Sequence, residues 1–188
     1  MKAKLHPTIE EYRGALGEIV FREVNGKTIV SRKASPSGEP TANQLAHRER
    51  FKDAAAYGKT VIANEVLSAL YEEAAKAKKI TIYLAAITDY IKAPSIQSVD
   101  LSTYNGHVGS LIQVHANDDF GLTKVHVSIT NSQGMPLENG DAVESTDTPN
   151  LWVYTAKFNV PADTLVMIRV VATDLPGGTA VQEESKQL

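Results

Sequence analysis

Acidic side chains recur at the turns of the C-terminal half, where several carboxylates could hold a cation together. Asp118 and Asp119 follow one apolar run, Asp174 ends another, and Glu144 and Asp147 lie between them in the chain. Hard cations such as calcium take several carboxylate and carbonyl oxygens. If these turns meet at one end of a domain, the five carboxylates form an acidic pole able to bind a cation or a partner.

This acidic pole has three interpretations. Its spacing matches no established calcium loop, and Asp-rich turns are common as solvated surface, so a solvated turn cluster is favoured over a calcium site. Calcium is nevertheless the one cofactor that the residues suggest. In the third interpretation the pole faces a basic neighbour, either the chain's own N-terminal half or an adjacent copy. Exposed ion pairs contribute only about 0 to 1 kcal/mol each, so they would orient such a contact rather than hold it.

Strands must position these carboxylates. From Ser95 onward, short apolar runs alternate with turn residues at a spacing of roughly 8 to 12, which is typical of an immunoglobulin-like (Ig-like) sandwich. Val125, Val127 and Ile129 alternate with polar residues, which indicates one buried face. The seven candidate strands lie near residues 95–101, 109–116, 123–131, 141–145, 150–158, 165–173 and 179–185.

The N-terminal half predicts a hairpin followed by helices. Asn25-Gly26 separates two β-rich runs within residues 18–32, and this dipeptide is the strongest short-range hairpin signal. Residues 1–17 read as an arm or irregular entry. Thr41 and Gln44 form a capping box that predicts a helix over 42–57.

Two further helices are expected before the strands begin. One starts near Asn64 and carries apolar residues at three- and four-residue spacing. Thr81 can cap the next, although Thr81 to Leu84 also reads as a short strand. Pro94 ends this helix, because the residue before a proline is pushed out of the α region.

The hairpin needs a surface to rest on. A two-stranded hairpin is marginal in water, so its apolar residues must pack on the chain's own helices or on another subunit. The sequence therefore predicts an assembly interface made of Ile19, Phe21, Val24, Ile29 and Val30.

Charge and periodicity both change at Ala93-Pro94. Residues 1–93 hold 15 Lys and Arg against 11 Asp and Glu, a net charge of +4, whereas residues 94–188 hold 4 against 11, a net charge of −7. We therefore expect an α+β chain in two parts. Residues 1–93 would form an arm, a hairpin and a helical assembly region, and residues 94–188 an all-β Ig-like sandwich of about seven strands.

The residues needed for several kinds of chemistry are absent from the sequence. The chain has no cysteine, so it can form neither disulfides nor thiol sites. It has no G-x-S-x-G elbow and no P-loop, and we expect no enzyme activity. Clustered cations could bind nucleic acid, but a solvated helix face is favoured, so no nucleic-acid partner is expected. These cations are Arg32, Lys33, Arg48, Arg50, Lys52 and the lysines of residues 76–79.

No segment reads as a membrane span or as a secretory signal after Met1. We expect the chain to be made in the cytoplasm without a signal peptide and to end in an assembled particle or an extracellular structure.

Both halves resemble known classes. The C-terminal half resembles the bacterial Ig-like modules of surface and virion proteins, through residues 118–129, 134, 138–140, 152–155 and 172–178. More faintly, the N-terminal half resembles uncharacterised bacterial and phage-associated proteins that begin with a glycine-punctuated hairpin. The matching residues are Gly14, Gly17, Val20, Phe21, Gly26, Lys27, Ser31, Arg32, Pro40, Thr41, Gln44, Arg48 and Phe51. The second resemblance implies a structural role.

Together these features predict a non-enzymatic structural subunit. It would self-assemble with copies of itself, alone or alongside other structural proteins, and display an Ig-like domain on a filament, virion or other phage-like repetitive assembly. The assembly mechanism expected is strand addition, or covering of a neighbour's helices, by the arm and hairpin. The alternative is a monomeric binding or adhesion module whose acidic pole captures a cation or a protein ligand.

Overall fold

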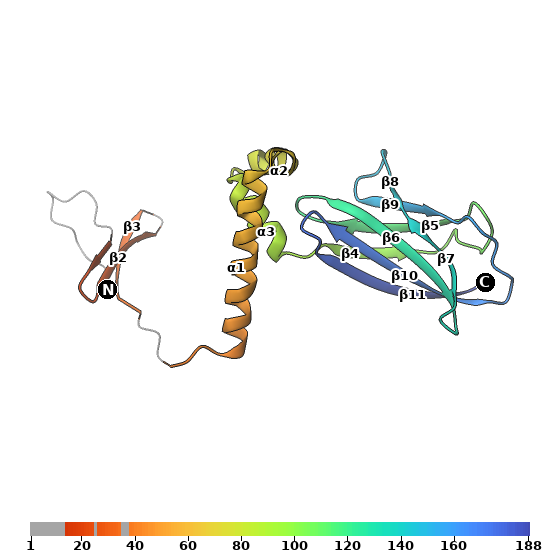
Figure 1. The fold of residues 1–188 in the computed structure, drawn as a ribbon, viewed down its shortest axis with the longest axis horizontal. Coiled ribbons are helices and arrows are strands. Elements are labelled where there is room, and N and C mark those ends of the chain that lie inside the picture. Colours follow the sequence, from red (N-terminus) through yellow and green to blue (C-terminus); the bar gives the residue numbers. More distant parts are fainter. Residues whose placement is uncertain (1–13, 25, 35–37) are drawn as a thin grey trace. The chain divides into compact units, whose positions relative to one another are not determined.

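The computed structural model describes residues 14–24, 26–34 and 38–188. The chain divides into two compact units, residues 1–42 and residues 43–188. The switch of period at Ala93-Pro94 lies inside the second unit, and the division into modules 1–93 and 94–188 stays a prediction. The observed elements confirm the α+β class, with strands, then helices, then a β-rich C-terminal part (Figure 1).

The first unit is a small antiparallel sheet. Its strands β1 (Gly14–Leu16), β2 (Ile19–Val24) and β3 (Lys27–Arg32) lie in the order β1-β2-β3. The predicted hairpin is confirmed as β2 and β3, which pair from Ile19 with Arg32 to Val24 with Lys27. Gly26 has a φ of 70°, which suits the glycine of a tight turn.

The arm predicted over residues 1–17 is partly corrected. Its last residues pair with the hairpin, because Gly14 to Leu16 form β1 against β2. Gly17 turns the chain between these strands with a φ of 61°. Residues 1–13 lie outside the described residues.

Three helices open the second unit: α1 (Ala42–Ala63), α2 (Glu65–Lys78) and α3 (Ile82–Ile91). The predicted cap at Thr81 is confirmed, since Thr81 Oγ1 accepts from the backbone N–H of Leu84. The helix start predicted near Asn64 is confirmed as well, and Asn64 caps α2 by accepting at Oδ1 from the backbone N–H of Val66. The segment after Thr81 is therefore a helix and not a strand. Among the described residues, no helix combines the length and the apolar character needed to cross a membrane.

Helix α1 is longer than the predicted span of 42–57. Gly58 does not end it, because this glycine lies where α1 meets α3 and is buried there. A Cβ on Gly58 would come within 2.9 Å of the Tyr83 ring and 3.2 Å of Ile87. The glycine thus permits close helix packing.

Two antiparallel sheets with a shared core form a β-sandwich. One has the order β4-β5-β9-β8, with β4 (Ser95–Asp100), β5 (Leu111–Asn117), β9 (Leu151–Thr155) and β8 (Val143–Glu144). The other has the order β11-β10-β6-β7, with β11 (Thr179–Gln187), β10 (Leu165–Asp174), β6 (Leu122–Asn131) and β7 (Pro136–Asp141).

The sandwich has one strand more than the predicted seven. Residues 136–141 read as turn because Pro136, Asn139 and Gly140 favour turns, but they form the edge strand β7 against β6. An edge strand tolerates a proline because one side of it needs no donor. The predicted strand over 141–145 shrinks to the two residues of β8.

The sandwich core contains the alternating residues that the sequence indicates. Ile112 and Val114 from β5 face Val125, Val127 and Ile129 from β6, all at 0% exposure. A second, smaller core surrounds Tyr71 and includes Val61, Ala75, Ala85 and Ala86. Phe120 and Leu175 from sandwich loops pack against this second core, so it joins the helices to the sandwich.

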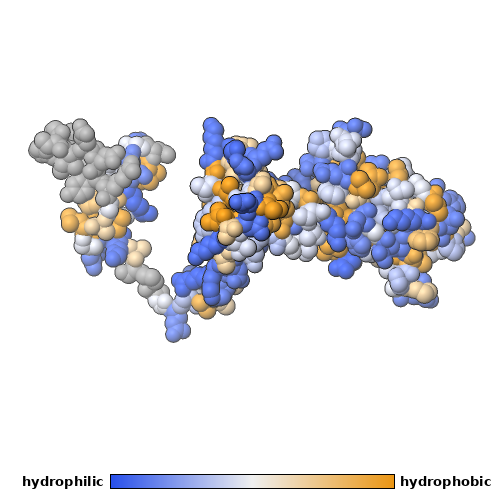
Figure 2. Space-filling model, turned by 45° about the horizontal axis from the view of Figure 1, so that its top comes forward, coloured by the Kyte–Doolittle hydropathy of each residue, from blue (hydrophilic) through white to orange (hydrophobic). Residues whose placement is uncertain are grey.

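Apolar side chains also remain at the surface of the helices (Figure 2). The exposed ones are Leu45, Phe51 and Ile62 on α1, Val66 and Leu70 on α2, and Leu84 and Ile91 on α3. Helices of a solvated domain usually present polar residues on their outer faces. These side chains thus form an exposed apolar surface on the second unit that another molecule could contact.

Shortening a side chain at the centre of the sandwich core should destabilise the protein. Ile112→Ala is expected to lower the free energy of unfolding by about 2 to 5 kcal/mol, because it removes buried methyl groups and leaves a cavity. Chemical denaturation followed by Trp152 fluorescence measures this change. Val143→Ala is the control, since Val143 is 73% exposed, and a loss as large as that of Ile112→Ala would contradict the assigned core.

Candidate functional site

Three carboxylates meet where the helices contact the sandwich. Asp89 lies on α3, Asp118 follows β5, and Asp174 ends β10. One possible ligand oxygen from each lies within 4.8 Å of the others. Asp89 is 1% exposed and Asp174 is 2% exposed, whereas Asp118 is half-buried. We refer to Asp89, Asp118 and Asp174 as the carboxylate cluster.

Each carboxylate of the cluster accepts a hydrogen bond from a neighbouring group of the protein. Tyr71 on α2 donates its hydroxyl proton to Asp89 Oδ2 over 2.5 Å. The backbone N–H of Phe120 donates to Asp118 Oδ2 over 2.8 Å. The backbone N–H of Gly178 donates to Asp174 Oδ1 over 2.5 Å. These donors hold the carboxylates in place and leave the second oxygen of each for another partner.

Aromatic side chains from the helices and from the turn after β5 lie beside the cluster. The hydroxyls of Tyr57 and Tyr71 lie 3.0 Å apart and extend the hydrogen-bond chain that reaches Asp89. The rings of Tyr71 and Phe120 are 5.7 Å apart, and Lys78 Nζ lies 4.1 Å from the centre of the Phe120 ring. These side chains keep water from part of the cluster and lower the local dielectric.

Burial makes the ionised cluster costly. The pKa of Asp89 is raised to about 7, chiefly by burial. The hydrogen bond from Tyr71 opposes this shift, and the carboxyls of Asp118 and Asp174 add to it. The pKa of Asp174 is also raised, chiefly by burial, although the N–H of Gly178 opposes the shift. Burial and the bond to Asp89 raise the pKa of the Tyr71 hydroxyl above its ordinary range, so Tyr71 remains a donor.

Two oxygens of the cluster are buried without a hydrogen bond to any described residue. They are Asp89 Oδ1 and Asp118 Oδ1. A buried acceptor without a partner is costly, so such atoms in a stable fold call for an explanation. Neighbouring carboxylates can meet this need in two ways, by sharing a proton or by sharing a cation.

The predicted acidic pole is only partly reproduced in the cluster. Asp118 and Asp174 belong to it. Asp119 turns to the helices, where its Oδ2 lies 2.7 Å from Lys92 Nζ and 3.7 Å from Lys78 Nζ. Lys92 is the leading cause of the lowered pKa of Asp119. This contact pairs the acidic turn with basic residues of the same chain, which is one form of the third interpretation of the pole.

The last two residues of the predicted pole lie outside the cluster. Glu144 is exposed on β8, and Asp147 is exposed in the turn before β9. Neither belongs to the group of carboxylates that could hold one ion among the described residues.

Asp89 is the site residue that the sequence interpretation missed. It belongs to a helix that is otherwise almost wholly apolar, and it lies three and four residues after the buried Ala86 and Ala85. A single acidic residue on the buried stripe of a helix is a usable signal, because a buried charge needs a partner.

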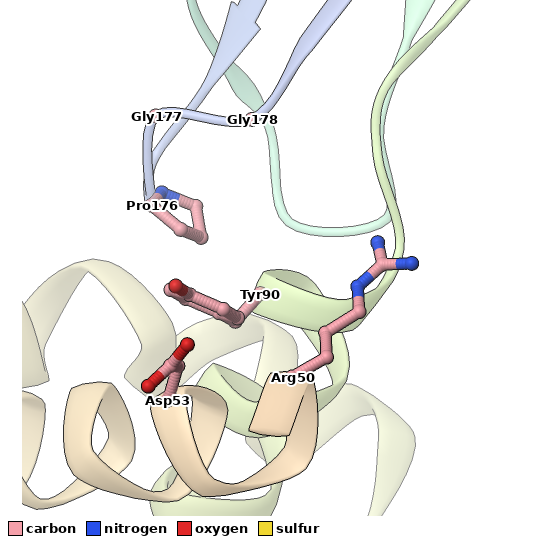
Figure 3. A pocket seen from close by; sticks show the side chains of 6 residues that line it. All are labelled: Arg50, Asp53, Tyr90, Pro176, Gly177 and Gly178. Atoms are coloured by element: carbon pink, nitrogen blue, oxygen red, sulfur yellow. The ribbon is translucent and has the colours of Figure 1, made fainter. Parts of the chain in front are cut away.

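A polar pocket of about 430 Å³ lies beside the cluster. Arg50 and Asp53 of α1 line it together with Tyr90 of α3 and residues 176–178 of the β10–β11 turn. Figure 3 shows Tyr90 between Pro176 and Asp53, with Arg50 at the other side. The guanidinium of Arg50 donates to the backbone oxygen of Ile91 over 2.6 Å. Gly178 lines the pocket and also donates its backbone N–H to Asp174 of the cluster.

A further buried carboxylate lies inside the sandwich, away from the cluster. Glu138 of β7 is 5% exposed, and its Oε1 accepts from the Tyr154 hydroxyl over 2.7 Å and from the backbone N–H of Lys157. Burial and the hydrogen bond to Glu138 raise the pKa of Tyr154. Glu138 is the only carboxylate in this network of described residues, and its role is structural, because it accepts hydrogen bonds that connect β7 to β9 and to the residues after it.

The five predicted assembly residues lie on two different faces of the small sheet. Phe21 pairs with Val30 and Leu16 with Ile19, and residues directly opposite each other project to the same side. Val24 and Ile29 belong to the other face, since Ile29 pairs with Arg22. We refer to Leu16, Ile19, Phe21 and Val30 as the apolar hairpin face.

Comparisons with known proteins find little. No family model and no curated protein matches the chain. Among solved structures, the chain is similar to the crystal structure of CopC from Methylosinus trichosporium OB3b, with 14% sequence identity and a TM-score of 0.38. The match covers 49% of this chain and 89% of that one.

Removing the Tyr71 hydroxyl should destabilise the fold. Tyr71→Phe leaves Asp89 without its donor from α2, and we expect the free energy of unfolding to fall by about 1 to 3 kcal/mol. Urea denaturation measures this loss. Tyr83→Phe is the matched control, because the Tyr83 hydroxyl makes no hydrogen bond to the described residues. Equal stability of Tyr71→Phe and wild type would show that this bond contributes nothing.

Proposed function

We propose that the protein is a non-enzymatic structural subunit that assembles with copies of itself through the small sheet and displays the sandwich from that assembly. One observation carries the proposal. None of the described side chains of β1, β2 and β3 is buried, although the sheet is rich in apolar residues. Leu16 is 64% exposed and Ile19 is 42% exposed on the apolar hairpin face.

A sheet of this size needs a surface to pack on. Three strands of three to six residues become stable when one face is packed, because apolar burial must offset the lost chain entropy. The apolar hairpin face offers Leu16, Ile19 and Val30 for that burial. A partner that covers this face would supply the missing core.

A second copy of the chain suits this role. It presents the same apolar hairpin face, and two such faces can pack on each other about a two-fold axis in the manner of a β-sandwich. In addition, β3 is an edge strand whose outer side pairs with no described strand. Edge strands accept a further strand, so strand addition at β3 can join such pairs into a repetitive assembly of the filament or virion kind.

We further propose that the sandwich is an Ig-like display module. In chain order, one of its sheets combines the first, second, fifth and sixth strands, and the other combines the third, fourth, seventh and eighth. Ig-like domains divide their strands between two sheets in this way, with an added strand beside the third in some of them. Such modules serve as spacers and decorations on larger assemblies.

Two isoleucines of equal exposure give a matched test of the assembly. Ile19→Asp should convert oligomers into folded monomers, because it places a charge on the apolar hairpin face. Ile29→Asp is the control, since Ile29 is 43% exposed on the opposite face and Ile19 is 42% exposed. Light scattering coupled to size exclusion gives the masses, and circular dichroism checks the fold.

The same measurement can reject the proposal. Wild-type protein that remains monomeric at high concentration would exclude self-assembly. Oligomers that persist in Ile19→Asp, or are lost equally in both variants, would show that the apolar hairpin face is not the specific interface.

A further inference from the structure

We propose that the carboxylate cluster binds one hard divalent cation, which fastens helix α3 to the loops of the sandwich. The site consists of Asp89 from α3, Asp118 from the β5–β6 turn and Asp174 from the end of β10. The inference does not rest on self-assembly, because every residue involved lies within the second unit.

The geometry suits one shared ion. Oxygens bound to a single calcium ion at about 2.3 to 2.6 Å lie no more than about 5 Å apart. The ligand oxygens of the cluster already meet this limit, since all lie within 4.8 Å of one another. No large movement of α3 or of the loops is needed to bring them to one ion.

The hydrogen bonds of the cluster divide each carboxylate into a held oxygen and an available one. Asp89 is held at Oδ2 by Tyr71, Asp118 at Oδ2 by Phe120, and Asp174 at Oδ1 by Gly178. Groups that hold the outer oxygen of a ligand are typical of metal sites, where they orient the inner oxygen toward the ion. Asp89 Oδ1 and Asp118 Oδ1 are two such inner oxygens, buried and without a described partner.

Side chains of the described part of the chain do not neutralise the cluster. No Lys or Arg nitrogen there lies within 4.0 Å of Asp89, Asp118 or Asp174, and the nearby Lys78 and Lys92 approach Asp119 instead. Buried carboxylates without a cationic partner are unfavourable. A bound cation would neutralise the carboxylates and remove this cost.

The donor set selects the kind of ion. All three side-chain ligands are carboxylate oxygens, which suit calcium, magnesium or manganese, whereas zinc and copper prefer nitrogen and sulfur ligands. Three carboxylates leave further coordination positions for water or backbone oxygens. Calcium fits the spacing with least rearrangement, because its bonds to oxygen are longer than those of magnesium.

Calcium titration of the full chain, first stripped with EDTA, tests the proposal. We expect saturable heat in calorimetry and a rise in melting temperature of several degrees, because an ion that binds only the folded state stabilises it. Terbium, a hard ion that replaces calcium, should show emission sensitised by the neighbouring Tyr71, and calcium should compete it away.

Two Asp→Asn variants at adjacent positions make the test specific. Asp118→Asn should lose the calcium-dependent rise in melting temperature and the terbium emission, because it removes a ligand. Asp119→Asn should keep both, since Asp119 is paired with Lys92 outside the cluster. Circular dichroism confirms that each variant is folded, and Asp174→Asn replaces Asp118→Asn if the latter is not.

Three outcomes would overturn the proposal. The first is that wild type shows neither heat nor a melting shift with calcium, magnesium or manganese at up to about 10 mM, a concentration above the dissociation constants of the weakest protein calcium sites. It would show that the carboxyls share a proton instead. The second is an equal response to calcium in wild type and Asp118→Asn, which would show that the ion binds elsewhere. The third is loss of the response in both Asp118→Asn and Asp119→Asn, which would show that the ion responds only to the total charge of the turn.

Discussion

The second unit depends on how three carboxylates are accommodated at the contact between α3 and the sandwich. Asp89 and Asp174 are almost wholly buried, and Asp118 lies beside them. Such a group is stable only if a proton or a cation offsets the repulsion between its members. Whichever species does so is part of the fold, because the same carboxylates lie where the helices meet the loops.

Apolar packing and charge act together at this contact. Phe120 and Leu175 follow the acidic residues Asp119 and Asp174 directly, and both pack against the core around Tyr71. The burial supplies stability, while the pairing of Asp119 with Lys92 fixes how the loop lies against the helices. The loops thus combine an apolar anchor with polar groups that permit few alternative arrangements.

The sequence predicted the elements whose signals are local. Asn25-Gly26 predicted the hairpin, and Asn64 and Thr81 predicted two helix starts, because caps and tight turns depend on a few neighbouring residues. Strand β7 was missed because an edge strand can carry the Pro136 and Gly140 that usually mark turns. Asp89 was missed for a different reason: its partners Asp118 and Asp174 come from distant segments. Only the folded arrangement shows that Asp119 leaves the predicted pole while Asp89 joins the cluster.

The distance along the chain between the members of the cluster has a consequence for folding order. Asp174 follows Asp89 by 85 residues, and Leu175, which completes the core around Tyr71, comes later still. During synthesis the helices emerge well before these partners exist. The contact between the helices and the loops of the sandwich can therefore form only after β10 has been made. Until then the helices have only their own shared core residues to pack on, and Asp89 lacks both of its acidic neighbours.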